Sequence, residues 1–74
     1  MDGPIEIPIR DEMIRLGQFL KLAGLVEDGA QARDVIERSD VRVNAQLETR
    51  RGRQLHIGDV IEVGGNRLIV ARRR

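Results

Sequence analysis

Residues 41–63 read V-R-V-N-A-Q-L-E-T-R-R-G-R-Q-L-H-I-G-D-V-I-E-V, and their alternation is the clearest structural signal in the chain. At the start of this stretch, Val41 and Val43 alternate with Arg42 and Asn44. A period of two is typical of a half-buried strand, which would turn the valines to the core and the polar side chains to solvent. The stretch therefore predicts short strands joined by tight turns.

The same stretch contains a crowded basic loop, in which Arg50, Arg51 and Arg53 surround Gly52. Like charges this close repel one another, and we expect folding to gain nothing from their proximity. An anionic partner is then the simplest reason for keeping them together. A solvated loop is the alternative, because short arginine-rich runs often have no binding role.

Charge is unevenly distributed along the chain. Residues 1–40 carry five basic and nine acidic side chains, whereas residues 41–74 carry eight basic and three acidic ones. The formal net charge of +1 therefore conceals two opposed halves and predicts a surface with one basic side. Twelve of the thirteen basic residues are arginine, whose planar fork can hold two phosphate oxygens at once. Phosphate is the favoured anion, although a GC-rich genome also enriches arginine.

Upstream of the loop, the pattern predicts an edge strand and a first helix. Isoleucines alternate over residues 5–9, and Pro8 confines such a strand to a sheet edge. A helix is expected from a cap near Asp11 to a stop at Gly24, because its apolar residues recur at helical spacing: Leu16, Phe19, Leu20 and Ala23.

A second helix is expected from about Gly29 to Arg38. Asp28 can cap its N-terminus, and Gln31 can reach back as the partner in a capping box. Asp34 and Arg38 are four residues apart, which suits a surface ion pair. The inward face would carry Ala32, Val35 and Ile36.

Beyond the second helix the period changes from about 3.6 to 2. Strands are expected near residues 41–44, 46–49, 60–64 and 67–71, with turns at Asn44-Ala45, Gly58-Asp59 and Gly64-Gly65-Asn66. The result is one α+β domain over residues 1–74, with two packed helices followed by a small, mostly antiparallel sheet. Residues 72–74 would form a basic tail, read as a disordered solubilising end or as a further contact.

Composition limits the possible functions. A chain of 74 residues buries only about 60% of its unfolded surface, so a deep substrate cavity is not expected. The chain has no cysteine and no long apolar run, and it opens without a signal peptide, which together predict a cytoplasmic protein that does not enter the membrane.

Catalysis and cofactors are not expected either. His56 is the single histidine, Ser39 is the single serine, and tyrosine and cysteine are absent, so the usual nucleophile and base cannot be assembled. No metal site is expected, because the acidic pairs suit helix starts. Phe19 is the single aromatic residue and belongs to the helix stripe, which disfavours the stacking of unpaired bases.

Four blocks carry a family resemblance: L-G-Q-F-L-K-L-A-G-L (16–25), A-Q-A-R-D-V-I (30–36), V-R-V-N-A (41–45) and G-D-V-I-E-V (58–63). In this order and spacing they resemble the RNA-binding domain named after small-subunit ribosomal protein S-four, also called the alpha-L RNA-binding motif. The resemblance covers about residues 15–63. The E-x-G-A-Q-A-R and E-T-R-R elements are similar to those of small bacterial proteins that consist almost entirely of this domain.

The resemblance implies that the helices and a hairpin present a basic face to structured RNA, with these contact candidates: Arg15, Lys21, Gln31, Arg33, Arg42, Asn44, Arg50, Arg51 and Arg53. Structural roles remain open for three of them, since Arg33 can pair with Glu37, Asn44 can serve the turn and Lys21 can be solvated. The chain also departs from the wider family, which often has serine-arginine-serine at residues 28–30 and aspartate in place of Gly17.

The expected function is a non-enzymatic, monomeric module that binds structured RNA, such as ribosomal RNA or tRNA. The ribosome or an RNA-modifying enzyme would be a further partner. The alternative is a protein-interaction module whose acidic N-terminal half docks a basic ribosomal or RNA-processing partner.

Overall fold

The computed structural model describes residues 3–38 and 41–73. Over these residues the chain forms two helices and seven strands in this order: β1 (Ile5–Ile9), β2 (Met13–Arg15), α1 (Leu16–Leu22), α2 (Gly29–Arg38), β3 (Arg42–Val43), β4 (Gln46–Leu47), β5 (Gln54–His56), β6 (Val60–Val63) and β7 (Asn66–Arg72). Five strands form a sheet in the order β1-β7-β6-β3-β4, and β2 pairs with β5 in a second, two-stranded sheet. The fold is α+β, as predicted.

Strand pairing is mostly antiparallel. The pairs β2–β5, β3–β4, β3–β6 and β6–β7 are antiparallel, and β1 pairs with β7 in parallel. Because β1 lies at the edge of the larger sheet, Pro8 is accommodated there, as the sequence predicted. The parallel pairing joins the two ends of the described chain, with Ile9 opposite Arg72.

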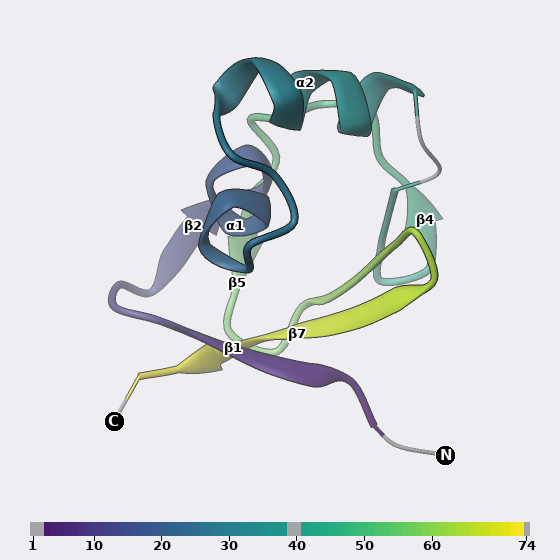
Figure 1. The fold of residues 1–74 in the computed structure, drawn as a ribbon. Coiled ribbons are helices and arrows are strands. Elements are labelled where there is room, and N and C mark those ends of the chain that lie inside the picture. The colour runs from purple at the N-terminus through teal and green to yellow at the C-terminus, as the bar shows by residue number, and fades with distance from the viewer. Residues whose placement is uncertain (1–2, 39–40, 74) are drawn as a thin grey trace.

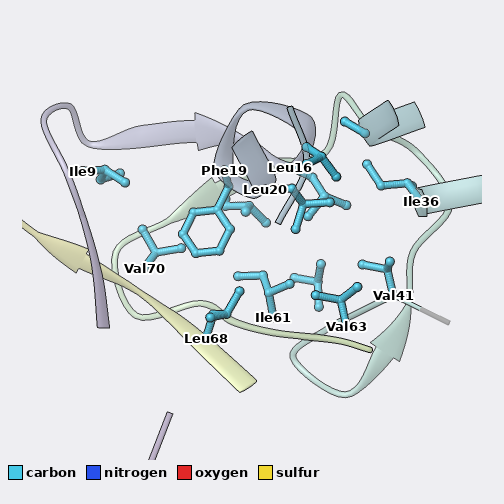
Figure 2. Close-up of a cluster of buried hydrophobic side chains, with 14 residues drawn as sticks. Ile9, Leu16, Phe19, Leu20, Ile36, Val41, Ile61, Val63, Leu68 and Val70 are labelled. Carbon is cyan, nitrogen blue, oxygen red and sulfur yellow. The ribbon is translucent and has the colours of Figure 1, made fainter. Parts of the chain in front are cut away.

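The core lies between the helices and the larger sheet. Figure 1 shows α1 and α2 together on one side, above the crossing strands β1 and β7. In Figure 2, Phe19 and Leu20 from α1 point toward Ile61, Leu68 and Val70 of the sheet. The Phe19 side chain is completely buried, so it contributes hydrophobic packing and offers no exposed ring for stacking.

The first helix begins later than the sequence predicted. We expected a start near Asp11, but Met13–Arg15 forms β2, and α1 begins at Leu16. Pairing with β5 satisfies the backbone of Met13 to Arg15 in an extended conformation, and Arg15 has φ −82° and ψ 150°. The partner strand is about forty residues away in sequence, so local periodicity could not reveal it.

The predicted stop near Gly24 is confirmed. The last residue of α1 is Leu22, and Gly24 follows with φ 79°. The amide of Gly24 donates to the carbonyl of Lys21 at 3.0 Å, and the amide of Leu25 donates to that of Leu20 at 3.0 Å. These two bonds form a Schellman motif, which needs a left-handed residue and therefore favours glycine.

The second helix has the predicted bounds and a slightly different cap. The amide of Gln31 donates to Asp28 Oδ1 at 2.8 Å. Gln31 Oε1 in turn accepts from the amide of Glu27 at 2.7 Å, one residue before the expected partner. The expected pair of Asp34 and Arg38 is present at 3.6 Å.

The turns follow the predicted residues, while the last strand is longer than expected. Asn44 and Ala45 have φ values of 52° and 70°, and Gly64 and Gly65 have values of 56° and 82°. Asn66, expected in the turn, begins β7. Arg72, expected in a loose tail, lies in β7 and pairs with Glu12 at 2.9 Å, while Arg74 lies outside the described residues.

Neither helix of the described chain is long and apolar enough to cross a membrane.

Candidate nucleic-acid interface

Glu48 organises the arginine loop from within. Its carboxylate is buried and accepts hydrogen bonds from the backbone amides of Thr49 and Arg50, both at 3.1 Å. It also accepts from Arg50 Nε at 2.9 Å and from Arg53 Nη1 at 2.8 Å. The Glu48 carboxylate therefore holds the backbone and two arginine side chains of the loop in one conformation.

The charge of Glu48 is strongly stabilised by these contacts. The hydrogen bond from Arg50 is the main cause that lowers the pKa of Glu48 from 4.5 to about 2, and the bond from Arg53 adds to it against the opposing effect of burial. The same contact holds the pKa of Arg50 above its ordinary value. The expectation that folding gains nothing from clustering these arginines is wrong for Arg50 and Arg53, because both hold Glu48.

The third arginine of the loop points elsewhere. The Arg51 side chain is exposed and has no hydrogen-bonded or ion-paired partner among the described residues. Together with Arg15 and Lys21 it lines a hollow of about 240 Å³ between α1, the first turn of α2 and the loop, here called the helix–loop hollow. None of the described residues that line it is acidic; the others are Gly17, Gln18, Gly29, Ala32 and Gly52.

Backbone hydrogen bonds hold the loop against the start of α1. The amide of Leu16 donates to the carbonyl of Arg53 at 2.8 Å, and the amide of Gly17 donates to that of Arg51 at 2.9 Å. Arg15 Nη1 lies 3.4 Å from the carbonyl of Gly52 and donates to it. These contacts between the loop and the start of α1 bring Arg15 and Arg51 close together, although they are distant in sequence.

Gly17 lies where the loop and both helices approach one another. A Cβ atom at this position would lie 3.5 Å from Arg51 and 3.8 Å from Ala32, which is ordinary contact. The Cβ atom of an aspartate, the residue that the wider family often has here, would therefore be in contact with Arg51. The glycine therefore leaves the basic hollow without an acidic neighbour at this position.

The other candidates lie outside this hollow. Arg50 and Arg53 line another hollow, together with His56 and Asp59, and Gly52 of the loop lines both that hollow and the helix–loop hollow. Arg42 is exposed on β3, opposite Glu62, and lines a separate hollow at the Gly64-Gly65 turn. The nine candidates therefore do not all line one hollow.

Three further candidates, besides Arg50 and Arg53, have structural partners. Asn44 Nδ2 donates to Asp59 Oδ1 at 3.1 Å, and Asn44 Oδ1 accepts from the amide of Val60 at 2.9 Å. Arg33 pairs with Glu37 at 3.2 Å, and the side-chain oxygen of Gln31 is part of the α2 cap. Each of these contacts explains the residue type without a ligand.

Sequence reasoning missed Glu48. It had appeared as one of three acidic residues in the basic half of the chain. The available signal was its spacing, since Arg50 and Arg53 follow two and five residues later. In the folded loop this spacing brings both arginine side chains to the Glu48 carboxylate.

The chain is similar in sequence and structure to known proteins. It is 48% identical over 65 residues to the probable ribosome maturation protein RlbA of Bacillus subtilis (strain 168), covering 88% of this chain and 89% of that protein. The solution structure of YbcJ from E. coli, described as revealing an alfaL motif involved in RNA-binding, matches with a TM-score of 0.70 and 28% identity over 96% of this chain and 91% of that one. The sequence model of the S4 domain matches residues 7–71. The chain therefore belongs to the S4 domain family.

Proposed function

We propose that this protein is a non-enzymatic module that binds structured RNA, such as ribosomal RNA or tRNA, through its arginine-rich surface. The observation that carries the proposal is the convergence of Arg15, Lys21 and Arg51 on the helix–loop hollow. Two guanidinium groups and an ammonium group, in a hollow lined by no described acidic residue, match the chemistry of backbone phosphates.

The N-terminus of α2, where Gly29 lines the hollow, is already capped by the carboxylate of Asp28, so the helix dipole gives no separate argument for an anion there. The structure of the loop does favour a bound anion. Arg51 projects from a loop that Glu48 already holds in place, so less conformational freedom would be lost on binding.

The relatives support the same chemistry. YbcJ is described as having a motif involved in RNA-binding, and the B. subtilis relative as a probable ribosome maturation protein. We accordingly propose one RNA-binding domain in residues 1–74, acting in the cytoplasm as a monomer on ribosomal RNA or a related partner. Arg15, Lys21 and Arg51 are its central contacts, and the other six candidates remain predicted contacts around them.

The buried Phe19 bears on the kind of RNA. Because the single aromatic ring lies in the core, recognition must use phosphates, 2′-hydroxyls and shape. A duplex or a folded stem is therefore the expected target, in preference to unpaired bases.

The test is a titration of a fluorescently labelled RNA stem-loop, beside duplex DNA of equal length, at several salt concentrations. The variants are Arg15→Gln, Lys21→Gln and Arg51→Gln, each of which removes one charge. We expect each to bind RNA roughly three- to tenfold more weakly, with a log–log salt slope reduced by about 0.9 for each lost phosphate contact.

Arg38→Gln is the matched control. Arg38 is exposed on α2, pairs with Asp34 and lines none of the described hollows around the loop, so its loss should leave RNA affinity within about twofold of wild type. Reversing all three loop charges would be a poorer test, since Arg50 and Arg53 hold Glu48. If wild type does not bind RNA at physiological salt, the proposal fails and a protein partner should be sought.

A further inference from the structure

Four of the described cations differ from the rest because their side chains have no hydrogen-bonded or ion-paired partner among the described residues. Arg33, Arg38, Arg50, Arg53, Arg67 and Arg72 pair with carboxylates, Arg15 donates to a carbonyl, and Arg42 also has an interaction. Within residues 3–38 and 41–73, the side chains without a hydrogen-bonded or ion-paired partner are those of Arg10, Lys21, Arg51 and Arg73. All four are exposed.

These four cations are gathered along α1. Lys21 and Arg51 line the helix–loop hollow. Arg10, Lys21 and Arg73 line a second hollow of about 610 Å³, here called the strand–helix hollow, between the end of β1, β2 and α1. Gln18 and Lys21 line both hollows, so the two are adjoining parts of one surface.

The parallel pairing of β1 with β7 places the two new arginines. Ile9 lies opposite Arg72, and the amide of Arg73 donates to the carbonyl of Ile9 at 3.1 Å. Arg10 follows Ile9 directly, and the pair of Glu12 and Arg72 at 2.9 Å ties the following loop to the same strand end. Arginines from opposite ends of the chain are thereby brought to one hollow.

We propose that the RNA-binding surface continues along α1 from the helix–loop hollow to the strand–helix hollow, and that Arg10 and Arg73 hold a further phosphate of the same RNA. This inference rests on the proposed function. Arg15 and Arg51 line one hollow, Arg10 and Arg73 line the other, and Gln18 and Lys21 line both, so the two arginine pairs can each hold a phosphate. Two phosphates of one structured backbone fit this arrangement.

Charge and continuity favour RNA as the occupant. The strand–helix hollow is lined by three cations and one carboxylate, that of Asp11, and it shares Lys21 with the helix–loop hollow. Its floor also includes Met13, Ile14 and Leu22, so an acidic peptide with apolar side chains is the competing occupant that the experiment must separate.

The test compares two double variants of the full chain with wild type. Arg10→Gln/Arg73→Gln removes both added cations. Arg38→Gln/Arg67→Gln removes the same charge from two exposed arginines that lie outside both hollows and pair with Asp34 and Glu62. Circular dichroism should give wild-type spectra for both, since all four side chains are exposed.

The probes are a labelled RNA stem-loop and a labelled peptide in which glutamate alternates with leucine. We expect Arg10→Gln/Arg73→Gln to bind the RNA about tenfold more weakly, with a salt slope lower by about 0.9 for the one lost phosphate contact, and the control double variant to stay within about twofold of wild type.

Each other outcome decides the question. If the Arg10/Arg73 variant binds RNA as wild type does while Arg51→Gln weakens binding, the extension is wrong and the proposed function stands. The same conclusion follows if the double variant loses the peptide and keeps the RNA, or if both double variants lose RNA equally. If wild type binds no RNA, the extension and the proposed function fail together.

Discussion

Individual side chains of the arginine loop have different roles despite their identical chemistry. Arg50 and Arg53 are bound to Glu48, at 2.9 and 2.8 Å, whereas Arg51 has no side-chain partner among the described residues. The loop therefore has a structural pair and one arginine directed to the helix–loop hollow. A buried carboxylate decides which arginine has which role.

Replacing Glu48 should destabilise the fold in a pH-dependent manner. Glu48→Gln removes charge-assisted hydrogen bonds to a buried acceptor, so we expect a loss of about 1–3 kcal/mol at pH 7. The pKa of Glu48 is about 2 in the fold against an ordinary 4.5, so its stabilising effect is complete above pH 4.5 and is lost as the pH falls toward 2. Urea denaturation at pH 7, 4.5 and 3 measures the difference between wild type and variant.

Glu37→Gln serves as the control, since that carboxylate is exposed on α2 and pairs with Arg33. It should change stability by less than about 1 kcal/mol. A Glu48→Gln effect that is the same size at pH 7 and pH 3 would contradict the assigned role of the charge.

Among the elements, the β3–β4 hairpin depends on a two-residue turn, Asn44-Ala45, for its backbone geometry. Asn44 and Ala45 both have positive φ, which is the geometry of the two-residue turn that suits the twist of paired strands. Asn44 tolerates this conformation and also uses its amide to hold Val60 and Asp59. Ala45, with φ 70°, bears the steric cost of the turn.

Ala45→Gly should therefore stabilise the protein. Removing Cβ from a left-handed residue relieves a clash of about 1–2 kcal/mol, of which part is offset by the greater freedom of glycine when unfolded. We expect a net gain of about 1 kcal/mol, measured by urea or thermal unfolding.

The same chemical change in a helix should have the opposite sign. Ala30 is exposed in the first turn of α2, and Ala30→Gly should cost up to about 1 kcal/mol. Equal effects of the two substitutions would mean that the turn is not strained.

In the molecule as a whole, the basic surface along α1 is not formed by the basic half of the sequence alone. Arg10, Arg15 and Lys21 come from the acidic first forty residues, and Arg51 and Arg73 come from the second half. Charge counting predicted one basic side from the arginines after residue 41. The fold instead neutralises several of those arginines and collects cations from both halves along α1.

The basic surface depends on the hydrophobic core that fixes α1 against the larger sheet. Phe19→Ala should therefore disrupt both the core and the basic surface. Phe19 is fully buried between α1 and the sheet (Figure 2). Its truncation should cost about 3–5 kcal/mol, against a total stability on the order of 0.05–0.15 kcal/mol per residue. Thermal unfolding monitored by circular dichroism should show a large fall in Tm, with RNA affinity falling at temperatures where the variant unfolds.

Phe19→Leu is the matched control, since it keeps an apolar side chain and should cost clearly less. A Phe19→Ala variant with a wild-type Tm would show that the core does not depend on this ring.

The amino-acid pattern was sufficient for features governed by neighbours in sequence. It predicted the bounds of α2, the end of α1 at Gly24, the inward valines at 41 and 43, and the turns at Asn44-Ala45 and Gly64-Gly65, because caps, periodicity and positive φ act over a few residues. The crowded basic loop drew attention to Arg51, and the resemblance to the S-four-type domain added Arg15 and Lys21 as contact candidates.

Long-range contacts account for the rest. The β2–β5 pairing displaced the expected start of α1, the folded loop turned Glu48 into a buried acceptor, and the β1–β7 pairing brought Arg10 to Arg73. Each outcome depends on residues far apart in sequence whose contacts form when the chain packs around one core. A local sequence pattern does not contain those contacts. Only the folded molecule therefore distinguishes the arginines that pair with carboxylates from those that have no partner among the described residues.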